Sequence, residues 1–482
     1  LEIRDLVLAA GRLSLDLSHL RFDQGRTCCV IGKSGSGKSL FAAALSGLPV
    51  PGLNVAGDIL LDAQQTSGSL WKDHVFVLPQ EPATALDPTM QVGKQLAEIF
   101  RWRRDPNCPW STPDALCAQV GLNAEDVKKF PEQLSGGMQQ RLMIAMALAA
   151  RAAFVVADEP TKGLDDNNKS RVIDLFKMIQ TSGRGLIIIT HDLDVARALA
   201  DDVVVFDHGS IVEHGSAEQM LANLRSEAAR ILLQSEPLNW PDQTVDIQDT
   251  QKPVLSVQNA TFGFSRRAPL IIDATIEIYG GEIVGLHGPS GAGKSTFADL
   301  CLGLHTPIRG SVRWFGEILD PVVIRTQRTR FQKLFQSPVT SFPPNLILGD
   351  VFDKLTPLSG EGHLSRETLL SKLSLDDTLL NRRPDQVSGG ELQRLAIVRI
   401  LLAQPKFLVC DEPSSRLDMS IQRLAIDIIK DYVTQTSAAV LLISHDRDVL
   451  QKRANRIFAI SSSGRLSRDQ NEDISSDTVS CV

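Results

Sequence analysis

The chain of 482 residues contains the same ordered set of short motifs twice. A glycine-rich loop, GKSGSGKS, begins at Gly32, and a second loop, GPSGAGKS, begins at Gly288. After each loop come LSGGMQQR or VSGGELQR, then VVADEP or LVCDEP, then THD or SHD, at offsets of 253 to 256 residues. Because chance matches would preserve neither order nor spacing, the sequence predicts two duplicated domains.

The domain boundaries follow from this repeat and from local composition. We expect a first domain over residues 1–233, a linker over 234–253 and a second domain over 254–461. The linker contains three prolines and mostly polar residues, a composition that is typical of an extended tether. The tail over residues 462–482 is polar and rich in Ser and Asp, so we expect it to be mostly disordered.

Composition restricts the class of function. A hydrophobic fraction of 43% and a charged fraction of 22% are typical of a soluble globular protein. The net charge of −7 disfavours a broad basic surface for nucleic acid. The longest apolar stretch, residues 142–157, contains Arg151 and is too short for a bilayer helix. Any work at a membrane is therefore expected to come through partner subunits.

Within each half, apolar runs alternate with helical patterns. Residues 27–31 and 283–286 are apolar runs that lead into the glycine-rich loops, and residues 154–157 and 407–410 read as further buried strands. Continuous apolar strands alternating with helices favour a mostly parallel sheet that is covered on both faces. The predicted fold class is therefore α/β, with one such sheet in each half.

The glycine-rich loops have the residues needed to hold phosphate. Glycines let backbone N–H groups turn toward an anion, and the helix that follows points its positive end to the same place. Lys38 and Lys294 are expected to reach the β- and γ-phosphates, and Ser39 and Ser295 are expected to bind Mg²⁺.

An acidic pair follows a buried strand in each half. We expect Asp158 and Asp411 to hold the Mg²⁺ shell, and Glu159 and Glu412 to orient or deprotonate the attacking water. A positioned base of this kind contributes roughly 10²–10⁴-fold to a rate. Ordinary acids at a strand end are the alternative, which the upstream loops make less attractive.

The Ser-Gly-Gly motifs at residues 135–137 and 388–390 precede long helical patterns. Serine can cap such a helix, and the two glycines allow close approach of the backbone to an anion. Taken alone, the motif is most often only the start of a helix.

Taken together, these motifs resemble the ATP-binding cassette (ABC) superfamily over nearly all of both halves. The resemblance implies tandem ABC-type P-loop domains, each with a parallel core and a helical signature subdomain, that hydrolyse ATP. It also implies that Ser-Gly-Gly of one cassette closes over the γ-phosphate held by the other. Lys38 would then work with Ser388, and Lys294 with Ser135.

Further motifs gain roles from the resemblance. Gln80 and Gln336 match the family's Q-loop, which couples nucleotide to the membrane subunit. His191 and His445 match the switch histidine that contacts the γ-phosphate. Gly163–Asp165 and Arg416–Asp418 match the D-loop.

The site residues expected on these grounds fall into three groups. Candidate catalytic residues are Glu159, Glu412, His191, His445, Gln80 and Gln336. Candidate metal ligands are Ser39, Gln80, Asp158, Ser295, Gln336 and Asp411. Candidate ATP-binding residues are Gly32, Lys33, Ser34, Gly35, Ser36, Gly37, Lys38, Ser39, Ser135, Gly136, Gly137, Asp165, Phe264, Gly288, Pro289, Ser290, Gly291, Ala292, Gly293, Lys294, Ser295, Thr296, Ser388, Gly389, Gly390 and Asp418.

One departure from the family pattern separates the halves. The family usually stacks an aromatic side chain on adenine, and Phe264 or Phe262 can do this in the second half. Matching Leu1 to Leu255 places Ala10 at the position of Phe264. We therefore expect the first site to hold adenine more weakly, unless Leu8 or Arg12 packs on the base.

Finer features resemble the peptide, opine and nickel importer branch of the family. They include LPQEPATALDPTMQVGKQLAE at residues 78–98 and GSIVEHGSAEQMLAN at residues 209–223. The resemblance implies a peripheral subunit at the cytoplasmic face of the inner membrane, with two permease partners and an extracytoplasmic substrate-binding protein. Peptides, opine-type metallophores and nickel chelates remain open as cargo.

Three other classes remain as alternatives. A tandem-cassette translation factor generally has a long charged helical linker, unlike residues 234–253. A fused sugar-importer ATPase usually has a second cassette that departs more from the family pattern. A nucleotide-binding subunit of a phosphonate-degrading complex is closer in sequence. The basic aromatic cluster at residues 101–104 reads either as a solvated helix face or as a contact for lipid headgroups or a permease loop.

Overall fold

The computed structural model divides into two compact units, Leu1–Gln234 and Ser235–Val482, which are described separately below. The positions named above that lie outside the described residues are Arg12, Ser34, Arg103, Arg104, Arg151, Arg416 and Asp418, together with linker residues 246–251 and the tail from residue 470. Within the tail expected over residues 462–482, Leu466–Arg468 instead forms strand β20, so the second domain extends past residue 461. The structure describes residues 1–10, 13–33, 35–47, 52–61, 64–65, 74–102, 105, 107–150, 152–245, 252–265, 268–355, 365–414, 417 and 419–469.

The first unit is built on a sheet with the strand order β5-β4-β1-β2-β10-β9-β3-β8-β7-β6. Strands β6, β7, β8, β3 and β9 run parallel, whereas β1, β2, β4 and β5 are antiparallel. The strands are β1 (Glu2–Ala10), β2 (Leu13–Arg21), β3 (Thr27–Gly32), β4 (Leu53–Leu61), β5 (Gln64–Gln65), β6 (Val75–Leu78), β7 (Phe154–Asp158), β8 (Gly185–Ile189), β9 (Asp202–Asp207) and β10 (Ser210–Ser216). The helices are α1 (Lys38–Ser46), α2 (Val92–Trp102), α3 (Pro113–Gln119), α4 (Gly136–Ala149), α5 (Asp166–Thr181), α6 (Leu193–Leu199), α7 (Ala217–Ala222) and α8 (Glu227–Ser235).

The parallel strands of the first unit are buried on both faces. Side chains alternate along β3, so that Cys29 and Ile31 join one hydrophobic cluster while Cys28 and Val30 join another. Because a strand sends successive side chains to opposite faces, continuous apolar runs are needed where both faces are covered. The predicted α/β fold with a mostly parallel core is confirmed here.

The second unit repeats this architecture with two sheets. A six-stranded sheet has the order β16-β17-β18-β13-β19-β20, and a four-stranded antiparallel sheet has the order β12-β11-β14-β15. The strands are β11 (Leu255–Phe262), β12 (Ile271–Ile278), β13 (Ile283–His287), β14 (Arg309–Trp314), β15 (Glu317–Ile318), β16 (Phe331–Leu334), β17 (Phe407–Asp411), β18 (Ala439–Ile443), β19 (Arg456–Ile460) and β20 (Leu466–Arg468). The helices are α9 (Lys294–Cys301), α10 (Pro321–Gln327), α11 (Leu348–Asp353), α12 (Arg366–Lys372), α13 (Gly389–Leu402), α14 (Met419–Thr436) and α15 (Arg447–Arg453).

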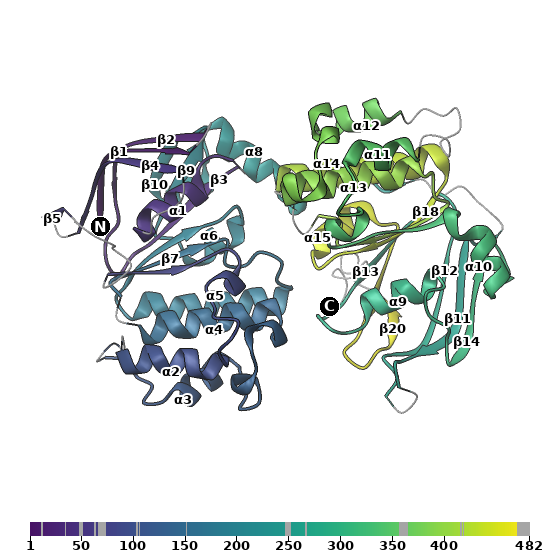
Figure 1. The fold of residues 1–482 in the computed structure, drawn as a ribbon, viewed down its shortest axis with the longest axis horizontal. Helices are drawn as coiled ribbons and strands as arrows, with labels where there is room; N and C mark the ends of the chain where they lie inside the picture. Colours follow the sequence, from purple (N-terminus) through teal and green to yellow (C-terminus); the bar gives the residue numbers. More distant parts are fainter. Residues whose placement is uncertain are drawn as a thin grey trace, which may run out of the picture. The chain divides into compact units, whose positions relative to one another are not determined.

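Each unit also has a group of helices at one side of its parallel sheet. Helices α2, α3 and α4 lie together in the first unit, and α11, α12 and α13 lie together in the second (Figure 1). Arg141 on α4 donates to the carbonyls of Val120 and Gly121, and Arg394 on α13 donates to those of Leu373 and Ser374. These matching bonds attach each Ser-Gly-Gly helix to its helical group.

The segment expected to be an extended tether is packed over part of its length. Trp240 is 2% exposed within a hydrophobic cluster of the second unit, and its indole donates to the carbonyl of Ser235 at 2.9 Å. The guanidinium of Arg453 lies 4.9 Å from the centre of the Trp240 ring and donates to the carbonyl of Pro241. The polar and proline-rich composition concealed this anchor, because burying one large aromatic side chain outweighs the polarity of its neighbours.

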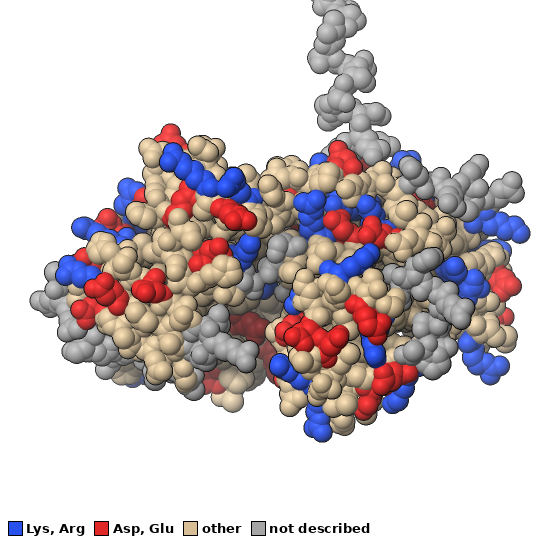
Figure 2. Space-filling view, turned by 90° about the horizontal axis from the view of Figure 1, so that it is seen from above, with Lys and Arg blue, Asp and Glu red and all other residues tan. Residues whose placement is uncertain are grey.

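Within the described residues, no helix is both long and apolar enough to cross a membrane. On the face drawn in Figure 2, acidic and basic side chains are interspersed, in keeping with the small net charge of −7.

Candidate active site

The carboxyl ends of neighbouring parallel strands bring the predicted residues together in each unit. In the first unit, adjacent strands β3, β8, β7 and β6 lead to the glycine-rich loop, to His191, to the acidic pair and to Gln80. In the second unit, β13, β18, β17 and β16 lead to the equivalent residues in the same order. This edge of an open α/β sheet is where ligands generally bind.

In the first glycine-rich loop, the ammonium of Lys38 points into the loop. Lys38 Nζ donates to the carbonyls of Gly32 at 2.7 Å and Lys33 at 2.8 Å, and the side chain is buried. Gly37, just before α1, has φ of 100°, and a Cβ there would lie 2.7 Å from Leu15 Cδ1. Only glycine accepts both that backbone and that contact, which explains the sharp turn into the helix.

The second loop has the same geometry. Lys294 Nζ donates to the carbonyls of Gly288 at 2.8 Å and Pro289 at 3.0 Å. Gly293, just before α9, has φ of 96°. In both loops a buried ammonium therefore lies at the start of a helix, where the helix end and the lysine together favour a phosphate group.

The first acidic pair lies at the end of β7, beside its loop. Asp158 is 8% exposed, and Ser39 donates a hydrogen bond to its carboxylate. Burial, followed by the charge of Glu159, raises the pKa of Asp158 to about 6. Among the described residues, no group bonds to the buried Oδ1 of Asp158.

These features test whether Mg²⁺ fits the first site. A buried carboxylate oxygen without a partner, next to a serine hydroxyl, is a donor set of the oxygen type that Mg²⁺ prefers. Deprotonated Asp158 and Ser39 therefore fit this cation.

The two glutamates adopt an unusual backbone conformation. Glu159 has φ of 48° and Glu412 has φ of 50°, in the left-handed region that costs a non-glycine residue roughly 1–3 kcal/mol. The N–H of Glu159 donates to the carbonyl of Ile189 at 2.8 Å, and that of Glu412 to Ile443 at 3.0 Å. These bonds to the neighbouring strand hold both carboxylates away from the direction that a regular strand would give.

Each glutamate meets its histidine. Glu159 Oε1 lies 2.8 Å from His191 Nδ1. Burial acts to raise the pKa of Glu159, but His191, Lys38 and Lys162 together lower it below its ordinary value. Glu412 meets His445 through Nε2 and also accepts a hydrogen bond from Gln336. Both carboxylates are thus positioned by a second polar group, as expected of groups that orient water.

The second acidic pair has a neighbour that the first pair lacks. Lys333 Nζ on β16 lies 3.1 Å from Asp411 Oδ2 and 2.8 Å from Asp299 Oδ1. Lys333 and Asp411 are both buried, with side chains 9% and 7% exposed. The sequence reading did not single out Lys333, although aligning the two loops places it opposite Val77.

Both Ser-Gly-Gly motifs cap helices, as their sequences indicate. The hydroxyl of Ser135 accepts from Met138 N at 3.3 Å at the start of α4. Ser388 accepts from Glu391 N at 3.3 Å and also donates its hydroxyl to Glu391 Oε2 at 2.7 Å. The second motif is therefore a reciprocal capping box, whereas Met138 cannot supply one in the first.

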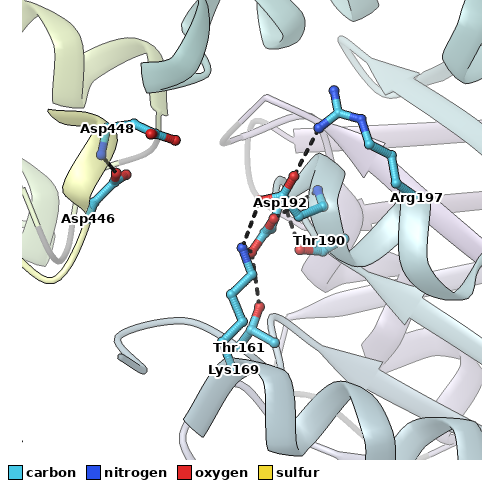
Figure 3. Close-up of polar contacts among 8 residues, drawn as sticks. Thr161, Lys169, Thr190, Asp192, Arg197, Asp446 and Asp448 are labelled. Carbon is cyan, nitrogen blue, oxygen red and sulfur yellow. Dashed lines mark hydrogen bonds and ion pairs between the residues drawn. The ribbon is translucent and has the colours of Figure 1, made fainter. Parts of the chain in front are cut away.

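The loop that carries His191 is tied down by a polar network (Figure 3). Lys169 Nζ on α5 lies 2.7 Å from Asp192 Oδ2 and 3.1 Å from Asp194 Oδ2. The charges of Asp192 and Asp194 raise the pKa of Lys169 despite the opposing effect of burial. In the second unit, Asp446 caps α15 by accepting from Asp448 N at 3.0 Å, and Gln422 takes the position of Lys169 in the repeat.

The aromatic expected near adenine is available in the second unit. Phe264 is 78% exposed and lies edge-on to His305, with ring centres 5.7 Å apart. Phe262 instead stacks on His305 at 4.6 Å and is buried, so of the two candidates Phe264 has the free face. Ala10 ends β1 in the first unit, but its side chain and Arg12 lie outside the described part of the structure.

The remaining predicted residues occupy defined places. Gln80 follows β6 and is exposed, and Asp165 caps α5 by accepting from Asn168 N at 2.8 Å. In the cluster at residues 101–104, Trp102 is 71% exposed and the guanidinium of Arg101 lies 4.7 Å from its ring centre. Lys333 and Lys169 were missed because their partners are distant in sequence.

Comparison with known proteins identifies the motifs. The family model described as ABC transporter matches residues 15–162 and 271–415. The chain is 32% identical to the peptidoglycan transport ATP-binding protein YejF of Agrobacterium fabrum, over 95% of this chain and 90% of that protein. It is also 32% identical to the glutathione import ATP-binding protein GsiA of Escherichia coli, over 94% of this chain and 82% of that protein.

Among solved structures, an archaeal ribosome recycling factor, aABCE1, in complex with the ribosomal stalk protein aP1, has a TM-score of 0.68. The likeness covers 96% of this chain and 89% of that one at 20% identity. At that identity the likeness concerns the tandem fold alone.

Proposed function

Because the chain belongs to the ABC transporter family, we propose that it is the ATP-hydrolysing motor of a membrane importer, bound to two permease subunits. The chain is an ATPase of that family. The observation that carries the proposal is similarity to two importer ATP-binding proteins over at least 94% of the chain. The repeated motifs of both halves support it. We place the protein at the cytoplasmic face of the inner membrane, working with an extracytoplasmic substrate-binding protein.

The groups at the strand ends support a division of labour in hydrolysis. Lys38 and Lys294 would bind the β- and γ-phosphates, together with backbone N–H groups of the glycine-rich loops. The lowered pKa of Glu159 keeps its carboxylate ionised at neutral pH, so it can accept a hydrogen bond from the attacking water. His191, 2.8 Å from Glu159, orients that carboxylate and can reach the γ-phosphate.

Mg²⁺, when bound, neutralises charge on the transferred phosphoryl group. In the first unit Ser39 and Asp158 would hold it, with Gln80 in reach of the same strand end. In the second unit Ser295, Asp411 and Gln336 would take these roles. Gln336 donates to Glu412, so the Q-loop and the water-orienting carboxylate are directly connected there.

We further propose that the two cassettes close head to tail on two MgATP. Lys38 would then share a nucleotide with Ser388, and Lys294 with Ser135. Under this arrangement, a cysteine at Gly35 in the first loop would lie near the second Ser-Gly-Gly motif, which contains Gly389. It would lie far from Gly136, which belongs to the motif of its own unit. A Gly35→Cys/Gly389→Cys pair should therefore cross-link with ATP bound, whereas the control Gly35→Cys/Gly136→Cys should not; equal cross-linking would contradict the arrangement.

The cargo we propose is a solute that contains peptide bonds. One relative is named for peptidoglycan and another for glutathione, a tripeptide. Metallophores and nickel chelates are the other candidates within the same branch.

Purification of the tagged chain from native membranes tests the partners. We expect two integral membrane proteins to co-purify in equal amounts. A Lys38→Ala/Lys294→Ala control should keep them but lose ATP hydrolysis, because the substitutions lie in the nucleotide loops. Recovery of ribosomes or of a soluble enzyme complex alone would overturn the importer assignment.

Reconstitution of that assembly in proteoliposomes, with its substrate-binding protein, tests the cargo. Short peptides or glutathione should stimulate ATP hydrolysis. Stimulation by a nickel chelate but by none of the peptides would contradict the peptide class while leaving the motor assignment intact.

A further inference from the structure

A buried lysine distinguishes the second acidic pair from the first. Lys333 contacts Asp411 at 3.1 Å and Asp299 at 2.8 Å, and only 9% of its side chain is exposed. A buried ammonium is retained only when carboxylates compensate for its lost hydration. The three side chains therefore form one charged unit on β16, β17 and α9, here called the lysine bridge.

The first unit has no such bridge at the equivalent positions. Val77 pairs with Val156, two residues before Asp158, just as Lys333 pairs with Val409, two residues before Asp411. Ala43 and Asp299 each lie five residues after the loop lysine, in α1 and α9. Neutral Val77 and Ala43 thus replace two charged residues at the same places in the fold.

The lysine bridge changes how the aspartate of the acidic pair can bind a metal ion. In the first unit, Oδ1 of Asp158 is buried without a partner among the described residues. In the second unit, Oδ2 of Asp411 is already held by the Lys333 ammonium. A divalent cation at the second site must share this carboxylate with an ammonium, whereas at the first site it need not.

We propose that Lys333 is a positioning residue of the second nucleotide site, which fixes the Asp411 carboxylate and weakens that site's affinity for divalent cation relative to the first site. The inference rests on the nucleotide sites proposed above and deepens them, because it assigns the two sites different dependence on the metal.

The direction follows from the charges. Lys333, 3.1 Å from Asp411 Oδ2, would repel any cation that this carboxylate binds. The Asp299 carboxylate, 2.8 Å from Lys333 Nζ, cancels part of the ammonium's field. With this partial cancellation, and with the effective dielectric constant of a site open to solvent, we expect a difference of roughly three- to tenfold in metal affinity. The net charges of the two clusters are equal, so the difference is local to the carboxylate.

Variants that leave one nucleotide site at a time allow the comparison. Lys38→Ala leaves the second site, and Lys294→Ala leaves the first. Mn²⁺ serves as the probe, with its affinity measured by electron paramagnetic resonance in the presence of saturating non-hydrolysable ATP analogue. The second site should bind Mn²⁺ roughly three- to tenfold more weakly than the first.

Lys333→Val/Asp299→Ala gives the second site the side chains of the first. In the Lys38→Ala background this variant should tighten Mn²⁺ binding by roughly the same three- to tenfold. Lys333→Arg keeps the cation and should leave the affinity near its starting value. Unchanged or weaker Mn²⁺ binding in the double variant would overturn the inference.

The reciprocal exchange guards against failure to fold. Val77→Lys/Ala43→Asp installs the bridge in the first site, and in the Lys294→Ala background it should weaken Mn²⁺ binding. Thermal unfolding identifies any variant that is not folded, and the exchange in the other unit then decides.

Binding of a fluorescent ATP analogue, measured in EDTA and again with Mg²⁺, distinguishes failure of the proposed nucleotide sites from failure of the lysine-bridge proposal. If neither site binds nucleotide with or without metal, the proposed nucleotide sites fail and this inference fails with them. If nucleotide binds but the bridge leaves Mn²⁺ affinity unchanged, this inference alone is refuted.

Discussion

The two cassettes carry the same candidate catalytic groups in different surroundings. Each has a loop lysine bonded to two loop carbonyls and a left-handed glutamate that meets a histidine. Around these groups the partners differ, since Asp158 is desolvated by burial while Asp411 is held by Lys333. The residues that would contact nucleotide, metal and water are thus the same in both cassettes. The side chains that contact these residues differ. The proposed reaction would therefore take place in two different electrostatic settings.

The largest effect is expected when the glutamate that both cassettes share is replaced in each of them. Glu159→Gln together with Glu412→Gln should keep ATP binding but lower turnover by about two orders of magnitude or more, because an amide cannot take a proton. ATP hydrolysis by the purified protein measures this. Each single variant then shows how much of the turnover belongs to each cassette. Near-normal hydrolysis in the double variant would mean that the base lies elsewhere.

A pH series should reveal the desolvated aspartate of the first cassette. The raised pKa of Asp158, about 6 against an ordinary 3.8, means that the folded protein holds a proton that the unfolded chain releases. The free energy of unfolding should therefore fall by about 2 kcal/mol as pH rises from 4 to 6 in EDTA. Subtracting the curve of Asp158→Asn isolates this contribution. A difference that is flat between pH 4 and 6 would contradict the shifted pKa.

The adenine contact should separate the cassettes in nucleotide affinity. An aromatic face on a base is worth roughly 1–3 kcal/mol, about five- to 150-fold in affinity. We expect tighter ATP binding in the Lys38→Ala variant, which leaves the Phe264 site, than in Lys294→Ala. Phe264→Ala should bring the two affinities together. Equal affinities at the outset would refute the asymmetry.

The smallest effect concerns the capping of the Ser-Gly-Gly helices. Glu391→Met gives the second motif the residue of the first and removes the reciprocal bonds with Ser388. The unfolding free energy of the second cassette should fall by about 0.5–1 kcal/mol, as for loss of a helix cap. Thermal unfolding measures this, with Met138→Glu as the matched exchange expected to stabilise α4. No change in either variant would show that the carboxylate does not stabilise the helix.

The order of the motifs predicts which residues gather at the strand ends, but it does not predict the residues that support them. The loops, the acidic pairs and the histidines follow one another along parallel strands, so motif order alone predicts that they meet at the strand ends. Lys333 was missed because its partners, Asp299 and Asp411, come from other elements, and one lysine in a strand ordinarily reads as a surface residue. The sequence signal for Lys333 is that the 256-residue offset between the two loops aligns it with the apolar Val77.

The join between the domains was misread for a related reason. Prolines and polar residues at 234–253 indicated a tether, yet Trp240 is buried in the second unit. Composition does not reveal a single buried indole, because one tryptophan hardly changes the average polarity of a segment. That one side chain can nevertheless anchor the segment. The antiparallel strands β11, β12 and β14 were likewise not expected, since their short alternating patterns gave no motif.

The packed join has a consequence for assembly. Ala229 and Leu232 of α8 lie in the core of the first unit, and Trp240 lies in that of the second, so few residues of chain separate the two anchors. Such a short covalent connection gives each cassette a high effective concentration of the other. Dilution cannot separate the pair, and the stoichiometry of one cassette to the other is fixed at synthesis. Two separate subunits would instead have to find each other, and could also pair with copies of themselves.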